Sequence, residues 1–163
     1  MFELKPLSRD AIPRSLERAE RYRVLNEPAE AESICLDVLG IDPGNQEAIV
    51  TLLLALTDQF ESGGLVSRAQ EVLPRVQGEY QRAYYAGIIS ERRARARLKH
   101  GGPGSGFAAY AWFREAMAHF ERAEVLKPAG NDDAVLRWNT CARILMRDSR
   151  LRPPPEEPEL MLE

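Results

Sequence analysis

The side chains that could carry acid–base, nucleophilic or metal chemistry are few and scattered. Both histidines, His100 and His119, and both cysteines, Cys35 and Cys141, stand apart from one another in the sequence. Glu115 precedes His119 by four residues, which places both on one helical face, but a metal site needs further ligands at compatible spacing. Neither cysteine belongs to a Cys-x-x-Cys pair, and both lie among helically spaced apolar residues, where a free cysteine acts as a small hydrophobe. We therefore expect no metal, no cofactor and no catalytic residue, and predict that the chain is not an enzyme.

A glycine-rich loop at residues 101–106 invites comparison with loops that cradle phosphate groups. Such a loop needs a strand before it and a Lys-Ser or Lys-Thr pair after it. Here a helical pattern precedes the loop and Phe107-Ala108 follows it. The segment is therefore interpreted as a flexible connector.

A run of positive charge precedes that loop. It consists of Arg92, Arg93, Arg95, Arg97 and Lys99. On a helix these side chains point in several directions, which is typical of a solvated extension of the helix. The alternative is a basic patch that binds an acidic partner segment or RNA. RNA is the less favoured of these partners, because no aromatic residues are interleaved to stack on bases.

Negative charge gathers at the other end of the chain. The 163 residues carry a formal charge of −3, to which residues 153–163 contribute −4 through four glutamates, so the rest sums to +1. This segment also contains Leu160-Met161-Leu162. One interpretation is a flexible, solubilising tail. The other is a short acidic and apolar peptide that docks in the chain's own groove, in a neighbour's groove, or on residues 92–99, which would permit self-association.

Charges interrupt the apolar residues at the N-terminus, so no signal peptide is expected. The longest uncharged apolar run, residues 48–57, is half of what a membrane span needs. These features predict a cytoplasmic protein with reduced thiols and no membrane contact. Arginine is used far more than lysine, which hints at a GC-rich bacterial source.

Apolar residues recur at helical spacing almost throughout, and no stretch shows the alternation of a strand. We predict an all-α fold, with residues 1–11 as a lead-in, 12–149 as one helical domain, and 150–163 as a Pro-rich acidic tail. Glycines, prolines and turn residues divide the domain, with Gly40 expected to end the second helix, Asn45 to cap the third and Pro74 to kink or shorten the fourth. The expected helices cover residues 12–25, 28–40, 45–61, 66–76, 79–99, 107–126 and 132–148.

Two of the turns are near copies of each other. Ile41-Asp42-Pro43-Gly44-Asn45 and Leu126-Lys127-Pro128-Ala129-Gly130-Asn131 each follow one amphipathic helix and precede another. Small or aromatic residues stand at fixed offsets before the prolines. This pattern resembles the tetratricopeptide repeat, a helix–turn–helix unit of 34 residues. The residues that match its packing positions are Ala19, Tyr22, Ala31, Cys35, Pro43, Ala69, Ala116, Phe120, Ala123 and Pro128.

The resemblance implies an α-solenoid of about three repeats closed by a capping helix. In that family the first helix of each repeat lines a concave groove. The positions that would line it here are Leu16, Glu20, Arg23, Val50, Leu54, Thr57, Tyr84, Ile88, Glu91 and Asn139. Val50 and Leu54 stand where a clamp for chaperone carboxylates would need polar donors, so an amphipathic groove is expected.

The resemblance thus implies a scaffold, adaptor or chaperone-like module that binds an unidentified protein or peptide without catalysis. The alternative is a nucleic-acid-associated or regulatory protein that uses the basic helix at residues 92–99. Because the resemblance is one of fold, it implies a class of function and no particular partner.

Overall fold

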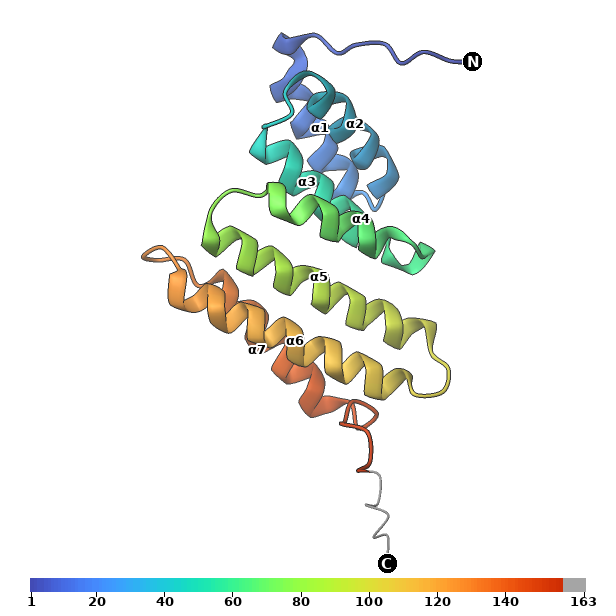
Figure 1. Cartoon of the computed structure of the whole chain (residues 1–163), viewed down its shortest axis with the longest axis vertical. Helices are drawn as coiled ribbons and strands as arrows, with labels where there is room; N and C mark the ends of the chain where they lie inside the picture. The colour runs from blue at the N-terminus through green and yellow to red at the C-terminus, as the bar shows by residue number, and fades with distance from the viewer. Residues whose placement is uncertain (157–163) are drawn as a thin grey trace, which may run out of the picture.

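The computed structural model describes residues 1–156, and the described chain is all helical. Seven α-helices follow one another along the chain, without a strand among these residues. They are α1 (Ile12–Val24), α2 (Pro28–Ile41), α3 (Gln46–Thr57), α4 (Leu65–Val72), α5 (Glu79–His100), α6 (Ser105–Leu126) and α7 (Asp133–Arg147). Figure 1 shows them stacked in sequence order, with the N-terminus at one end of the stack and the C-terminal segment at the other.

Each helix packs against the next, and α1 also contacts α3, as α3 contacts α5. Helices α1, α3 and α5 therefore lie side by side, and α5 and α6 run along each other over most of their length. Helix α7 packs on α6 and meets α5 through the ion pair of Arg137 with Glu91. Two clusters of buried apolar residues fill the stack. One is built mainly from α1 to α4, the other from α5 to α7, and Tyr85 of α5 packs against both. The central helix α5 thus joins the two halves.

Small residues allow the helices to approach closely. Ala19, Ala31, Ala69, Ala116 and Ala123 are all fully buried, as are Cys35 and Phe120. Tyr22 is half-buried against the first cluster, whereas Pro43 and Pro128 are exposed in turns. Helices α5 and α6 approach closely at Gly87 of α5, where a Cβ atom would lie 2.4 Å from the ring of Phe120 on α6. A glycine is required there because any side chain would overlap that ring.

Several predicted helix ends are confirmed. Asn45 caps α3 by accepting a hydrogen bond from the backbone N–H of Ala48 at 2.9 Å. Pro28 begins α2. Pro74 shortens α4 as expected, but the helix ends at Val72 instead of the predicted residue 76, and a 3₁₀ turn over Leu73–Arg75 follows.

Other predicted ends are wrong. Gly40 does not end α2, because the helix continues to Ile41, whose side chain packs against the first cluster, and Asp42 is the C-cap. Helix α3 stops at Thr57 instead of residue 61, since a 3₁₀ turn over Phe60–Ser62 directs the Phe60 ring into the core. Helix α6 begins two residues early at Ser105, after the left-handed Gly104.

The folded body also extends beyond the predicted boundary at residue 149. Leu151 is buried in the second cluster, and the Arg150 carbonyl oxygen lies against Gly106 of α6, where a Cβ would come within 2.3 Å. The guanidinium of Arg152 lies 6.0 Å from the centroid of the Phe107 ring. The chain therefore folds back onto the start of α6 before the acidic tail begins. No helix within residues 1–156 is both long enough and apolar enough to cross a bilayer.

Candidate functional site

The odd-numbered helices α1, α3, α5 and α7 present a surface rich in ion pairs, which we call the odd-helix face. Asp58, the C-cap of α3, connects two of its helices. Its Oδ2 accepts a hydrogen bond from Arg23 Nε of α1 at 2.8 Å, and its Oδ1 lies 3.8 Å from Arg92 Nη1 of α5. The buried Arg92 Nε has no hydrogen-bond partner within residues 1–156. One carboxylate thus lies between two guanidinium groups, one of which keeps a donor available.

A second charged group lies under this face. Glu91 of α5 is fully buried, and its Oε2 lies 3.2 Å from Arg137 Nη1 of α7 and 3.6 Å from Arg95 Nε of α5. Its other oxygen, Oε1, accepts a hydrogen bond from the thiol of Cys141 at 3.5 Å. Burial works against the charge of Arg137, but the neighbouring Glu91 raises the pKa of the guanidinium above its ordinary value. This buried pair fastens α7 to α5.

Two adjoining hollows open between α5 and α7. The first, of about 310 Å³, is lined by Arg95 and by Thr140, Arg143, Ile144, Met146 and Arg147 of α7. The second, of about 240 Å³, is lined by Tyr84 and by Asp133, Leu136, Arg137 and Thr140. Met146 and Leu136 are 82% and 62% exposed. The lining therefore combines guanidinium groups with apolar side chains that are open to solvent, a composition that suits an acidic and apolar segment.

The opposite end of the odd-helix face has another character. A hollow of about 660 Å³ at the start of α2 is lined by residues that include Glu27, Glu30, Asp58 and Glu61. A neighbouring hollow of about 420 Å³ is lined by Arg23, Val24, Asn26, Asp58, Glu61 and Arg92. The larger hollow near α2 contains four carboxylates and no guanidinium group, whereas the hollow beside Met146 contains three guanidinium groups and no carboxylate. The polarity along the face gives a partner a preferred direction.

The residues predicted to line a groove divide into three groups. Leu16, Thr57, Ile88 and Glu91 are buried, so their side chains are not available to a partner. Thr57 donates its hydroxyl to the Leu54 carbonyl oxygen at 2.8 Å. The half-buried ones are Arg23, Val50, Leu54, Tyr84 and Asn139, and Glu20 is exposed. The physical cause is packing: Leu16 and Ile88 belong to the two apolar clusters, and Glu91 is enclosed beside Arg137 of α7.

The basic run of α5 is largely occupied by contacts within the chain. Arg92 and Arg95 lie beside Asp58 and Glu91, as described above. The guanidinium of Arg93 lies 3.6 Å from the centroid of the Trp112 ring. Arg97 donates from Nη1 to the Gly101 carbonyl oxygen at 2.8 Å, and Lys99 Nζ donates to Glu61 at 2.9 Å. Each of the five cations therefore has a partner, unlike the cations of a solvated extension.

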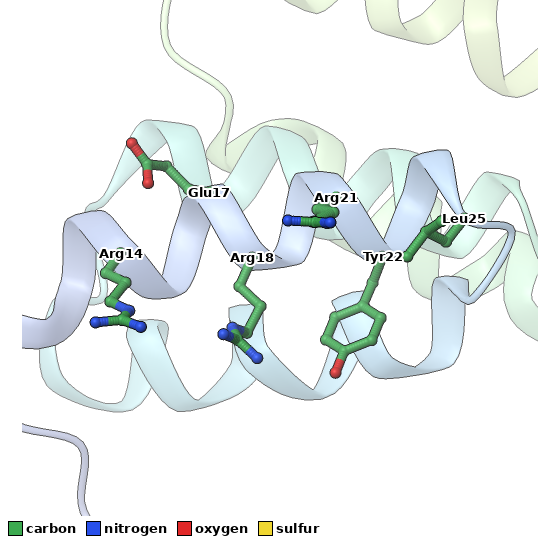
Figure 2. Close-up of a pocket in the computed structure, with 6 residues that line it drawn as sticks. All are labelled: Arg14, Glu17, Arg18, Arg21, Tyr22 and Leu25. Atoms are coloured by element: carbon green, nitrogen blue, oxygen red, sulfur yellow. The ribbon is translucent and has the colours of Figure 1, made fainter.

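Sequence reasoning missed a hollow on α1. It has a volume of about 340 Å³ and is lined by Arg14, Glu17, Arg18, Arg21, Tyr22 and Leu25. Figure 2 shows the side chains of Arg14, Arg18 and Tyr22 in a row on one side of the helix, with Glu17 on the other side. The three arginines are exposed, and none forms an ion pair within residues 1–156. The signal in the sequence was the helical spacing of these arginines over two turns.

The cysteines and histidines that could carry chemistry are either buried or belong to no cluster of metal-binding side chains within the described residues. Burial raises the pKa of the Cys35 and Cys141 thiols to about 12, so both are protonated at neutral pH. Burial also lowers the pKa of the half-buried His119, against the opposing influence of Glu115. Within the described residues no group of three His, Cys, Asp or Glu side chains is placed to hold a metal ion.

Comparison of the chain with models of protein families, with curated proteins and with solved structures finds no match.

Proposed function

We propose that this chain is a tetratricopeptide-like helical module that binds an acidic, partly apolar segment of another protein along its odd-helix face. Two observations support the repeat-like arrangement: consecutive helices pack in order, and α3 also contacts both α1 and α5. Small residues stand at the predicted close contacts and are fully buried. A stack of this kind has extended surfaces that are suited to binding peptides.

The observation that carries the proposal is the hollow between α5 and α7. Arg143 and Arg147 supply cations there that form no ion pair within residues 1–156, while Ile144 and the exposed Met146 supply apolar surface. An acidic segment would pair with guanidinium groups that offer planar, bidentate donors. Its apolar side chains would cover Met146 and Ile144, which gives the affinity that surface charges alone rarely provide. The function is binding, with no covalent step.

A short fluorescein-labelled peptide of Glu, Leu and Ala residues tests this proposal, with the same peptide carrying Lys in place of Glu as the comparison. Fluorescence anisotropy should show binding of the Glu peptide alone. Charge reversal in R143E/R147E should weaken it by about tenfold or more when both chains compared also carry R14E/R18E, which removes the cations of a separate hollow on α1. R114E/R122E reverses two exposed arginines on α6 and should have no such effect. Equal binding of both peptides, or unchanged binding by R143E/R147E, would contradict the proposal.

We further propose a bacterial cytoplasmic setting, which the preference for arginine over lysine supports. The alternative in which residues 92–99 bind nucleic acid has less support, because each of the five cations already contacts a partner within the chain. Retention on an RNA column at low salt that is lost in R92E/R93E would favour that alternative instead.

A further inference from the structure

The hollow on α1 is a cationic surface separate from the hollow between α5 and α7 that carries the proposed function. It faces away from the rest of the stack, because α1 lies at one end of the stack and packs against α2 and α3. Arg14, Arg18 and Arg21 are exposed around Tyr22 and Leu25, and Leu25 is 58% exposed. Figure 2 shows that Glu17, the one acid in the lining, lies away from the row formed by Arg14, Arg18 and Tyr22. The hollow therefore offers several cations that form no ion pair within residues 1–156, next to apolar surface.

A complementary segment exists in the same chain. Residues 153–163 contain four glutamates and no cation, and they include Leu160-Met161-Leu162. Glu156 is exposed, and residues 157–163 lie outside the described part of the structure. Carboxylates and large apolar side chains thus occur together in the tail, as guanidinium groups and apolar side chains do in the α1 hollow.

We propose that the acidic tail of one copy docks in the α1 hollow of a second copy. The tail of the same copy cannot reach it, because α1 and the C-terminal segment lie at opposite ends of the stack (Figure 1). Three packing steps separate α1 from α7 along the odd-numbered helices, or about 25–30 Å at 8–10 Å per step. The seven residues after Glu156 span at most about 25 Å when fully extended, and they start beyond α7.

This contact is heterologous, since the tail and the hollow are different surfaces at opposite ends of the chain. Each copy offers one donor tail and one acceptor hollow, so association continues head to tail and does not stop at a symmetric dimer. Because the attraction is between exposed charges, it should weaken as ionic strength rises above the physiological range. Mass should therefore increase with protein concentration at low salt and decrease toward one chain at high salt.

Sedimentation equilibrium of the full chain tests this proposal. The wild-type chain should associate at low salt, whereas R14E/R18E should stay at the mass of one chain. The tail variant E156K/E157K/E159K should also stay at that mass. Mixing the two variants should restore association, because each acidic hollow then meets a basic tail and each basic hollow meets an acidic tail. Circular dichroism and the urea midpoint of each variant check that it folds like the wild type.

The matched control is R114E/R122E, which makes the same change of charge on α6 and should associate like the wild type. R143E/R147E should also retain self-association. Loss of peptide binding at the hollow between α5 and α7 is therefore distinguishable from loss of self-association through the α1 hollow. A wild-type chain that stays monomeric at low salt would overturn the inference. So would association of R14E/R18E at the wild-type level, or mixed variants that remain monomeric.

Discussion

Helices α1 and α5 are both rich in arginine, yet their cations have opposite surroundings. On α5, the basic residues from 92 to 99 contact acidic, aromatic or carbonyl groups, most of which other elements supply. On α1, Arg14, Arg18 and Arg21 point into an open hollow and form no ion pair within residues 1–156. The longer basic run is therefore the less available of the two.

The difference follows from position in the stack. Helix α5 lies in the middle, where α3 and its following turn bring Asp58 and Glu61, and where α6 brings Trp112. Helix α1 has a neighbour on one side alone, so its outer face keeps its charges for a partner. The comparison of α1 with α5 indicates that a cluster of charged residues marks a binding surface only where no other element neutralises it. If this is correct, substitutions on α5 should cost stability, and those on α1 should cost binding.

The largest effect is expected for R137A, which removes the closest cation from the fully buried Glu91. Arg95 stays 3.6 Å from the same oxygen, but the buried carboxylate loses its nearer guanidinium, and we expect a loss of about 2–3 kcal/mol in the free energy of unfolding. Urea denaturation measures it. Alkylation by iodoacetamide should also become faster at Cys141, which contacts Glu91, and stay slow at Cys35 on α2.

R143A is the matched control for R137A, because it removes an exposed arginine from the same helix and should change stability by less than about 0.5 kcal/mol. If R137A were as stable as R143A, the buried pair would not be what fastens α7 to α5.

A smaller loss is expected for G87A, which tests the close contact that holds α5 against α6. The new Cβ would lie 2.4 Å from the Phe120 ring, so one of the two helices must shift. We expect a net loss of about 1–2 kcal/mol, since overpacking outweighs the gain in helix propensity. G40A is the control: nothing lies within 4 Å of a Cβ at this exposed helical position, so it should stabilise the chain slightly. Equal urea midpoints for the two variants would show that α5 and α6 are loosely packed.

A loss of about 0.5–1 kcal/mol is expected for R93A, which removes the guanidinium from the Trp112 ring. The same urea experiment measures it, and the emission of the newly exposed indole should shift to longer wavelength. R114A removes an exposed arginine from α6 without such a ring contact and should alter neither quantity. A red shift without any loss of stability would mean that Arg93 covers the indole but does not stabilise the fold.

Much of the helical framework could be predicted from the sequence. Apolar spacing and turn residues placed five of the seven helices within about two residues of their observed ends, and the predicted α3 and α4 each ran four residues too far. The predictions failed where tertiary packing decides the end of a helix. Helix α2 continues through Gly40 because Ile41 gains contact with the core, and α3 stops early because Phe60 must turn inward. Local helix propensity predicts neither of these contacts with the core.

The candidate site was harder to predict, because its contacts join distant parts of the chain. Glu91 has the same local pattern as an exposed groove residue, but its nearest cation, Arg137, lies 46 residues later. Arg23 and Arg18 belong to one helix, yet Arg23 meets Asp58 whereas Arg18 faces an open hollow. Spacing places these side chains on a helix. It does not show which of them another helix will cover.

The smallest effect on stability is expected for R18A, and this prediction decides the comparison. Arg18 is exposed and has no ion pair within the described residues, so its removal should change the free energy of unfolding by less than about 0.5 kcal/mol. R23A on the same helix should cost more, because it separates α1 from Asp58. The same R18A chain should associate measurably less than the wild type at low salt. A stability loss above about 1 kcal/mol would show that Arg18 serves the fold, and α1 would then resemble α5 instead of contrasting with it.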